Sequence, residues 1–362
     1  MSSGRLRALA VSAGSMALLP LPLPGFGPPP KQPGSGHFPQ RPDPTVVKPA
    51  PLKPGQRAAY HNPVFGRVFP DPTVMRVGRT YYAYGTTTGP RRRNLFPILR
   101  SRDLVHWRRA GYAMRRPPRF SSSRWWAPSA LRWRGRYYLF YSAQARRPDK
   151  MCVAVAVARR PTGPFHHRSR LACGGSGGSI DPAPLVVGRR VYLYFARTDG
   201  ACKRFPGRCS IVGMPLRRDL RRERARPKRL IGIDQPWEAS RHYAIVENPW
   251  VVKRGGLYYL LYSGNDWQRA YGMGYAISRS PLGPFVKPEP RPFLRARFGL
   301  FAPGGGSVIR GPRGRTWLVY HARREGPGFA NDGRRSLHID RLLVRGGRVR
   351  VNGPTLESAT AP

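Results

Sequence analysis

Residues 69–84 read FPDPTVMRVGRTYYAY, and they place Pro72 ten residues before Tyr82, within an aromatic run that is typical of a buried strand. The same ten-residue spacing recurs four times along the chain. The later anchors are Pro128, Pro182, Pro249 and Ser307, and the runs that follow them lie at 137–141, 191–195, 257–262 and 316–320. The chain between residues 61 and 352 therefore consists of five similar units.

The length of these units indicates the fold class. Successive anchors are 56, 54, 67 and 58 residues apart, which is enough for one four-stranded antiparallel sheet with its turns. One such sheet cannot bury both of its faces, whereas five sheets arranged radially bury each face against a neighbour. We therefore predict an all-β, five-bladed β-propeller over residues 61–352. The alternative, a pair of β-sandwiches, would not produce one repeated unit.

The segments outside the repeat have a different composition. Arg5 and Arg7 precede an uncharged stretch from residue 8 to residue 30, which predicts a secretory signal over residues 1–27, with a disordered tail as the alternative. Ten prolines between residues 28 and 54 predict a disordered, Pro-rich linker over residues 28–60. Residues 353–362 are predicted to be a flexible tail. No later segment is apolar enough to span a membrane, so we expect a secreted protein.

The composition sets limits on the class of protein. Lys and Arg number 65 against 17 Asp and Glu, a formal charge of +48, while 40% of the residues are hydrophobic and argue against general disorder. The 41 glycines and 41 prolines argue against a mainly helical fold. The four cysteines show no metal-binding spacing. In an exported chain they predict two disulfides, most simply Cys152–Cys173 and Cys202–Cys209, although other pairings or free thiols remain open.

Three of the few acidic residues fall within two positions of an anchor proline, namely Asp71, Asp181 and Glu247. The first strand of a propeller blade lies nearest the axis, so we expect these carboxylates to converge in the channel. Close carboxylates raise at least one pKa, and a neutral acid beside a carboxylate base is the equipment of glycoside hydrolysis. The aromatic rings of Phe69 and Trp126 would suit a sugar face. The alternative is that Asp-Pro only begins a turn.

Taken in order, the segments FPDP (69–72), WAP (126–128), SIDP (179–182), VENP (246–249), YYL (258–260) and YHA (320–322) resemble glycoside hydrolase family 43. The resemblance covers nearly all of residues 61–350. It implies a five-bladed propeller and inverting hydrolysis of α-L-arabinofuranosides or β-D-xylosides in plant cell-wall polysaccharide. It also implies the roles of individual residues, with Asp71 as general base, Glu247 as general acid, Asp181 as the third carboxylate, His321 as a histidine near a central calcium or sodium ion, and Arg335 as a substrate contact.

Two departures from the family pattern concern the site. The residue after the acid is usually small in the family, whereas Asn248 is larger and changes the expected shape of the sugar subsite. Glu238 is a rival for the acid, but it lies eleven residues before Pro249 and outside the anchor register, so Glu247 is preferred.

Other functions fit the sequence less well. A non-catalytic carbohydrate-binding propeller would not need all three carboxylates, and the Asn-Asp-Pro-Asn-Gly motif of retaining fructan-type enzymes is missing. No nucleic-acid-binding signature appears, and the eight basic residues within 217–229 are expected at the solvated edge of blade 3. The hydrolysis needs no cofactor, and any calcium or sodium ion would be structural. We expect an arabinose- or xylose-containing polysaccharide as substrate, and an anionic wall polymer as a partner of the basic surface.

Overall fold

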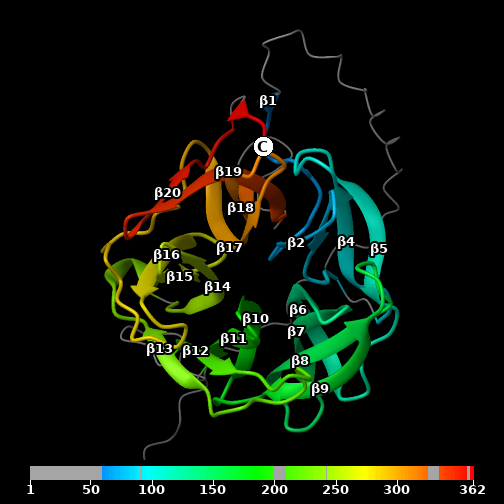
Figure 1. Ribbon diagram of the computed structural model, residues 1–362. Coiled ribbons are helices and arrows are strands. Elements are labelled where there is room, and N and C mark those ends of the chain that lie inside the picture. The colour runs from blue at the N-terminus through cyan, green and yellow to red at the C-terminus, as the bar shows by residue number, and fades with distance from the viewer. Residues whose placement is uncertain (1–58, 90–91, 199–208, 242, 325–333, 357–358) are drawn as a thin grey trace, which may run out of the picture. The chain divides into compact units, whose positions relative to one another are not determined.

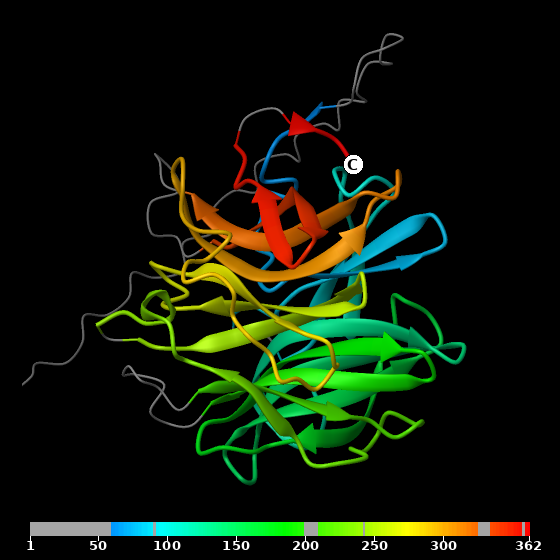
Figure 2. The same ribbon diagram turned by 60° about the vertical axis from the view of Figure 1, so that its left-hand side comes forward.

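The computed structural model describes residues 59–89, 92–198, 209–241, 243–324, 334–356 and 359–362. Within these residues the fold is all-β, with one short 3-10 helix, η1 (Pro236–Glu238). The sheets stand around a common axis, as Figure 1 shows face-on and Figure 2 shows after a turn of 60°. Two sheets have four strands and one has three, while an eight-stranded sheet consists of two blades joined by a single parallel bridge between Gly178 and Met151. The predicted five-bladed β-propeller is confirmed.

Each blade is an antiparallel sheet whose strands follow one another along the chain. Blade 1 holds β2 (Thr73–Val77), β3 (Thr80–Tyr84), β4 (Leu95–Ser101) and β5 (Arg108–Met114). Blade 2 holds β6 (Ser121–Trp133), β7 (Arg136–Ala145), β8 (Met151–Ala158) and β9 (His166–Ala172). Blade 3 holds β10 (Gly178–Val187), β11 (Arg190–Thr198), β12 (Ser210–Pro215) and β13 (Lys228–Gly232).

The last two blades complete the ring. Blade 4 holds β14 (Val246–Arg254), β15 (Leu257–Gly264) and β16 (Gly272–Ser278), and its fourth position is marked by one isolated bridge between Ile277 and Val286. Blade 5 holds β17 (Leu300–Arg310), β18 (Thr316–Arg324), β19 (Ser336–Arg345) and β20 (Arg348–Asn352). The first strand of every blade contacts the first strand of the next, and β17 contacts β2, so the inner strands close a circle.

The hydrophobic core is divided among the interfaces between blades. Five clusters of buried side chains each combine residues from two neighbouring blades. The strand period of two explains this division, because Tyr258 packs against blade 3 while the adjacent Tyr259 packs against blade 5. The aromatic runs of the sequence therefore supply both faces of each blade.

The two ends of the described chain meet beside blade 5. The backbone of β1 (Ala59–Tyr60) pairs with that of β21 (Ala359–Thr360). Asn62 also bonds the backbone of Ile339 through both of its side-chain groups. Residues 59–60 and 359–360 were predicted as linker and tail, and the structure corrects both boundaries. Composition alone could not show this, because strands of two residues depend on a partner that is distant in sequence.

The predicted disulfide Cys152–Cys173 is confirmed, and it joins β8 to the segment after β9 with a Cα–Cα distance of 4.3 Å. Cys209 is also disulfide-bonded. Its predicted partner Cys202 lies outside the described residues, as do the predicted signal at 1–27 and the linker up to residue 58. Among the residues described, no helix has the length and hydropathy needed to cross a membrane.

Asp340 connects the chain ends to blade 5, which makes it a test of this closure. Its carboxylate accepts hydrogen bonds from Tyr60 Oη at 3.2 Å, Tyr320 Oη at 2.7 Å and Thr355 Oγ1 at 2.5 Å. Asp340→Ala should lower the free energy of unfolding by about 2–3 kcal/mol, because buried hydroxyl groups lose their acceptor. Denaturant unfolding measures the loss. Asp340→Asn keeps the volume and one acceptor, so equal losses in the two variants would contradict this account.

Candidate active site

The innermost strands share a backbone feature at the anchor prolines. The residue before each proline has a left-handed conformation, with φ of 51° at Asp71, 43° at Ala127, 59° at Asp181 and 50° at Asn248. The ladder shifts register at this point in blades 2, 3 and 4. A left-handed conformation costs a non-glycine residue about 1–2 kcal/mol. Bulges of this kind redirect side chains, and here they occur beside the carboxylates.

A ring of hydrogen bonds joins neighbouring blades at these same residues. In blade 5 the left-handed position is Gly305, with φ of 57°. Each of the five left-handed residues donates its backbone N–H to a side chain of the preceding blade. The donors and acceptors are Asp71 to His321 Nδ1 at 3.1 Å, Ala127 to Thr86 Oγ1 at 2.7 Å, Asp181 to Ser142 Oγ at 2.9 Å, Asn248 to Asp181 Oδ2 at 3.1 Å, and Gly305 to Ser263 Oγ at 3.0 Å. We call this set the inter-blade ring.

Four acceptors of the inter-blade ring occupy one register, on the second strand of a blade or just after it. Ser142 pairs with Trp126, Ser263 with Glu247 and His321 with Gly304, and in each case the partner is the residue that precedes the left-handed one. Thr86 has the same place in blade 1, since its N–H donates to Pro70 O. Blade 3 has Ala196 at this register, which offers no side-chain acceptor. The carboxylate of Asp181 binds the N–H of Asn248 instead.

Asp71 is held on both carboxylate oxygens. Thr86 Oγ1 donates to Oδ2 at 2.6 Å and Arg335 Nη1 donates to Oδ1 at 3.0 Å. Arg335 is 19% exposed in its side chain, and its guanidinium lies over the ring of Trp267, 5.0 Å from the ring centroid. Asp71 is thus a buried carboxylate with a fixed orientation and a positive partner.

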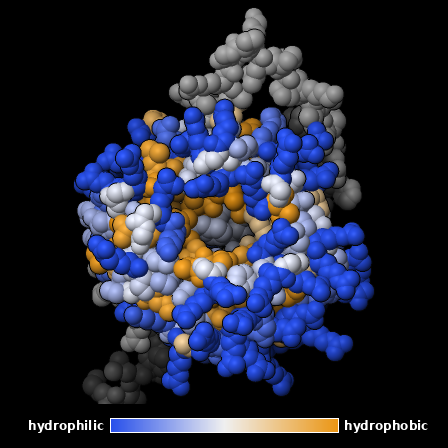
Figure 3. All heavy atoms as spheres, viewed as in Figure 1, coloured by the Kyte–Doolittle hydropathy of each residue, from blue (hydrophilic) through white to orange (hydrophobic). Residues whose placement is uncertain are grey.

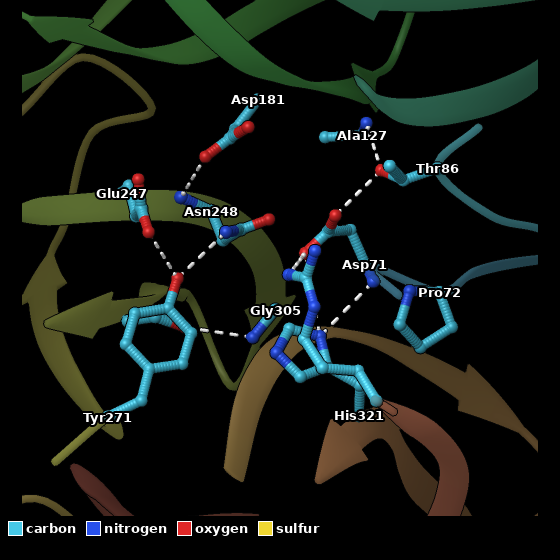
Figure 4. A network of polar contacts seen from close by, with 12 residues as sticks. Asp71, Pro72, Thr86, Ala127, Asp181, Glu247, Asn248, Tyr271, Gly305 and His321 are labelled. Atoms are coloured by element: carbon cyan, nitrogen blue, oxygen red, sulfur yellow. Dashed lines mark hydrogen bonds and ion pairs between the residues drawn. The ribbon is translucent and has the colours of Figure 1, made fainter. Parts of the chain in front are cut away.

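Glu247 and Asp181 form the other side of the site (Figure 4). Tyr271 Oη donates to Glu247 Oε1 at 2.7 Å, and it accepts a hydrogen bond from Asn248 Nδ2 at 2.9 Å. Burial raises the pKa of Glu247 to about 7; the Tyr271 hydrogen bond opposes the increase, and the charge of Asp71 adds to it. Burial, and then the charges of Glu247 and Asp71, raise the pKa of Asp181 well above its usual range. The site can therefore keep one carboxyl group protonated near neutral pH.

The three carboxylates are close to one another, as predicted. Asp71 and Asp181 line a void of about 10 Å³ on the propeller axis together with Asn248 and Gly305. Figure 4 shows Asp71 facing Asp181 and Glu247 around this point. In the space-filling view of Figure 3, hydrophobic residues border the central hollow, and hydrophilic residues cover the rim.

The two aromatic residues that were predicted to contact a sugar differ in their exposure. Trp126 is half-buried, and the guanidinium of Arg124 lies 5.7 Å from its ring centroid. Phe69 is 1% exposed and packs in the core cluster between blades 5 and 1. Its ring therefore has almost no surface for a ligand, and we correct its predicted role to support of the chain that leads into Asp71.

Glu238, the rival acid, belongs to a separate buried cluster. It is 0% exposed, Lys287 Nζ lies 2.5 Å from its Oε1, and Tyr262 Oη donates to the same oxygen at 2.6 Å. Its Oε2 accepts the backbone N–H groups of Asp234 and Gln235. Both carboxylate oxygens of Glu238 are thus fully bound by structural partners, which favours Glu247 as the acid.

Several residues of the site had not been identified from the sequence. Thr86, Ser142 and Ser263 could have been found, because a polar residue directly after or near the end of an aromatic run recurs in the same register. Tyr271 and Trp267 lie in the segment between β15 and β16, outside the repeated register. No local signal in that segment marks either residue as part of the site.

His321 had been expected near a central calcium or sodium ion. Its Nδ1 accepts the N–H of Asp71, and burial lowers its pKa well below the usual range, so the ring is neutral. Its Nε2 is buried and has no hydrogen-bond partner among the described residues. Within the same residues no group of three His, Cys, Asp or Glu side chains is arranged to hold a metal ion. A calcium or sodium ion near His321 therefore stays a prediction, and no step of the proposed chemistry involves a metal.

Comparison with known proteins agrees with this geometry. The sequence model of Glycosyl hydrolases family 43 matches residues 60–347. A β-D-galactofuranosidase, xynD of Aspergillus niger, is 26% identical over 285 residues, which are 72% of this chain and 76% of that protein. An extracellular endo-α-(1→5)-L-arabinanase of Thermotoga petrophila is 24% identical over 60% of this chain and 50% of its own length. The crystal structure of a thermostable family-43 glycoside hydrolase superimposes with a TM-score of 0.72 at 28% identity, covering 84% of this chain and 99% of that one.

Tyr271 should tune the acidity of Glu247. Its hydrogen bond lowers the pKa of that carboxyl group, so Tyr271→Phe should raise the pKa and keep Glu247 protonated to higher pH. Carbon-13 NMR of labelled glutamate carboxyl groups follows the titration directly. Tyr262→Phe removes a comparable buried hydroxyl from Glu238 and serves as the control, since it should leave the Glu247 titration in place. A Glu247 pKa that falls or stays constant in Tyr271→Phe would refute the assignment.

Proposed function

Because this chain belongs to glycosyl hydrolase family 43, we propose that it hydrolyses α-L-arabinofuranosidic or β-D-xylosidic bonds in plant cell-wall polysaccharide with inversion at the anomeric carbon. Family membership makes it a glycosidase that cleaves O-glycosidic bonds. The observation that carries the mechanism is a pair of unlike carboxyl groups, with Glu247 raised to a pKa of about 7 and Asp71 bound to Arg335.

In this proposal Asp71 is the general base. Thr86 and Arg335 hold its two oxygens, so the carboxylate needs no reorientation when it removes a proton from the attacking water. Glu247 is the general acid, and it delivers its proton to the oxygen of the leaving sugar as the glycosidic bond breaks. Water attacks from the face opposite the leaving group, which inverts the anomeric configuration.

Asp181 is assigned to the acid rather than to the water. The negative charges of Asp181 and Glu247 repel each other, which favours a state in which these two carboxyl groups share one proton. Its bond to the backbone N–H of Asn248 places it beside the residue that follows Glu247. We infer that Asp181 positions Glu247 and helps to keep its carboxyl group protonated near neutral pH.

The sugar is proposed from the relatives and the family resemblance together. The Thermotoga relative is an endo-α-(1→5)-L-arabinanase and the Aspergillus relative is a β-D-galactofuranosidase, an enzyme that cleaves the glycosidic bond of a five-membered sugar. A galactofuranoside therefore belongs among the test substrates beside the arabinofuranoside and the xyloside. The extracellular relative supports secretion of this enzyme, and the high positive charge supports its retention on an anionic wall polymer. This hydrolysis requires no cofactor.

Asp71→Ala and Glu247→Gln should each lower kcat/KM on phenyl α-L-arabinofuranoside or phenyl β-D-xyloside by about 10³-fold, since each removes one acid–base group and phenol is a poor leaving group without protonation. Glu223→Gln changes an exposed acid elsewhere and should keep full activity. Proton NMR during the first turnovers should show the inverted anomer. Similar rates in the wild type and both catalytic variants would exclude the mechanism, and a retained anomer would exclude inversion.

The pH dependence should identify the acid. Glu247 must be protonated to act, so kcat/KM should fall as pH rises through about 7. Glu247→Gln should lack this decline. A dinitrophenyl leaving group departs without protonation, so this variant should approach the wild-type rate on such a substrate while staying slow on an alkyl glycoside. Equal impairment on both substrates would show that Glu247 is not the acid.

A further inference from the structure

A pocket of about 710 Å³ lies between the outer parts of blades 2 and 3, at a distance from the carboxylates. Its walls carry five arginines and a tyrosine, which are Arg136, Tyr138, Arg159, Arg160, Arg168 and Arg221. We call this the arginine pocket. Nothing in the proposed hydrolysis uses it.

The arginine pocket opens on the face of the propeller opposite the catalytic residues. Asp181 and Glu247 lie near the starts of β10 and β14, so in antiparallel blades the ends of the inner strands lie on the other face. The hairpin between the first and second strands and the hairpin between the third and fourth strands both belong to that face. The pocket is built from the start of β7, the β8–β9 hairpin and the turn between β12 and β13.

The backbone of this pocket is firmly held. Leu220 is 0% exposed and anchors the turn between β12 and β13 in the core between blades 2 and 3. Ser169 Oγ donates to Arg221 O at 2.7 Å, and Trp133 Nε1 donates to Arg218 O at 3.2 Å, which fastens the turn to blade 2. Residues 218–221 of the basic run are therefore held in place, and Asp219 and Arg221 form a fixed part of the pocket wall. Binding of a ligand here would therefore carry only a small free-energy cost for ordering the backbone.

The charge of the arginine pocket is unbalanced. Asp219 is the single carboxylate in its lining, and it accepts the backbone N–H of Arg221 at 3.1 Å. Across the described parts of the chain, none of the five pocket guanidinium groups forms an ion pair with a carboxylate. Like charges gathered in a concave surface attract an anionic ligand, and the planar fork of arginine binds a carboxylate through two parallel hydrogen bonds.

The other lining residues suit an acidic sugar. Tyr138 is half-buried, and its ring lines the pocket together with Pro164, which provides apolar surface for one face of a pyranose. Single-stranded nucleic acid is bound by several large aromatic rings that stack on successive bases, whereas the lining of this pocket holds one tyrosine and the imidazole of His166. A smaller pocket of about 430 Å³ in blade 1 places Tyr82 among Arg100, Arg102 and Arg108. Tyr82 and Tyr138 have the same position in the repeat, which suits a ligand with repeated units.

We propose that the arginine pocket binds the carboxylate-bearing sugars of an acidic, uronate-containing polysaccharide. The pocket would hold the enzyme on this polymer while the channel on the opposite face cleaves neutral side chains. The choice of a polysaccharide rests on the proposed function, but binding at the pocket does not require hydrolysis.

The test is affinity electrophoresis of the full chain in gels that contain polygalacturonate, with neutral arabinan as the comparison polymer. The pocket variant is Arg159→Gln/Arg160→Gln/Arg168→Gln. The control variant Arg189→Gln/Arg254→Gln/Arg345→Gln removes the same charge from exposed hairpin residues of other blades on the same face. We expect the pocket variant to bind polygalacturonate about tenfold or more weakly than the wild type, and the control variant within about twofold.

Three outcomes would overturn the proposal. These are equal losses in the pocket and control variants, no retention of the wild type by polygalacturonate, or pocket-dependent binding of single-stranded DNA in place of polygalacturonate. Glu247→Gln should bind as the wild type does. Pocket-dependent binding by a chain that is inactive on every glycoside would support the pocket and refute the proposed function. Full hydrolytic activity without pocket-dependent binding would support the proposed function and refute the proposal for the pocket.

Discussion

The inter-blade ring is the constraint on which the site depends. Five left-handed residues direct their backbone N–H groups into the crowded centre of the propeller, where a donor without a partner would cost about 1–3 kcal/mol each. A side chain from the preceding blade satisfies each donor. The same bonds that close the circle therefore fix the backbone at Asp71, at Asp181 and beside Glu247, so the assembly of the blades sets the positions of the three carboxyl groups.

Blade 3 is the exception in the inter-blade ring, and this exception explains why a carboxylate, Asp181, takes part in it. Ala196 stands where the other blades carry Thr86, Ser142, Ser263 and His321, so the donor at Asn248 has only the carboxylate of Asp181 to bind. Asp181 thereby joins blades 3 and 4 and also faces Glu247. Asn248, whose size departs from the family pattern, contributes as well, because its side chain reaches the hydroxyl of Tyr271 that bonds the acid. Structural and chemical demands are combined in the same residues.

The distribution of charge follows from the blade geometry. The acids of the site are enclosed at the axis, while the basic residues are carried on hairpins and blade edges, where solvent reduces their mutual repulsion. The run 217–229 does lie at the edge of blade 3, as expected from the repeat. Its rigid attachment through Leu220 and Ser169 was not predictable, because these contacts join segments about 50 residues apart.

The sequence by itself determined the number of blades, their order, and the convergence of Asp71, Asp181 and Glu247, because a spacing repeated five times can be satisfied by one circular arrangement. It also indicated the Cys152–Cys173 disulfide. Only the tertiary structure decided that Phe69 is core, since the left-handed turn at Asp71 breaks the alternation that would have put both side chains in the channel. The tertiary structure also decided the positions of Tyr271 and Trp267 in the site and the pairing of the chain ends, because each depends on partners that are distant in sequence.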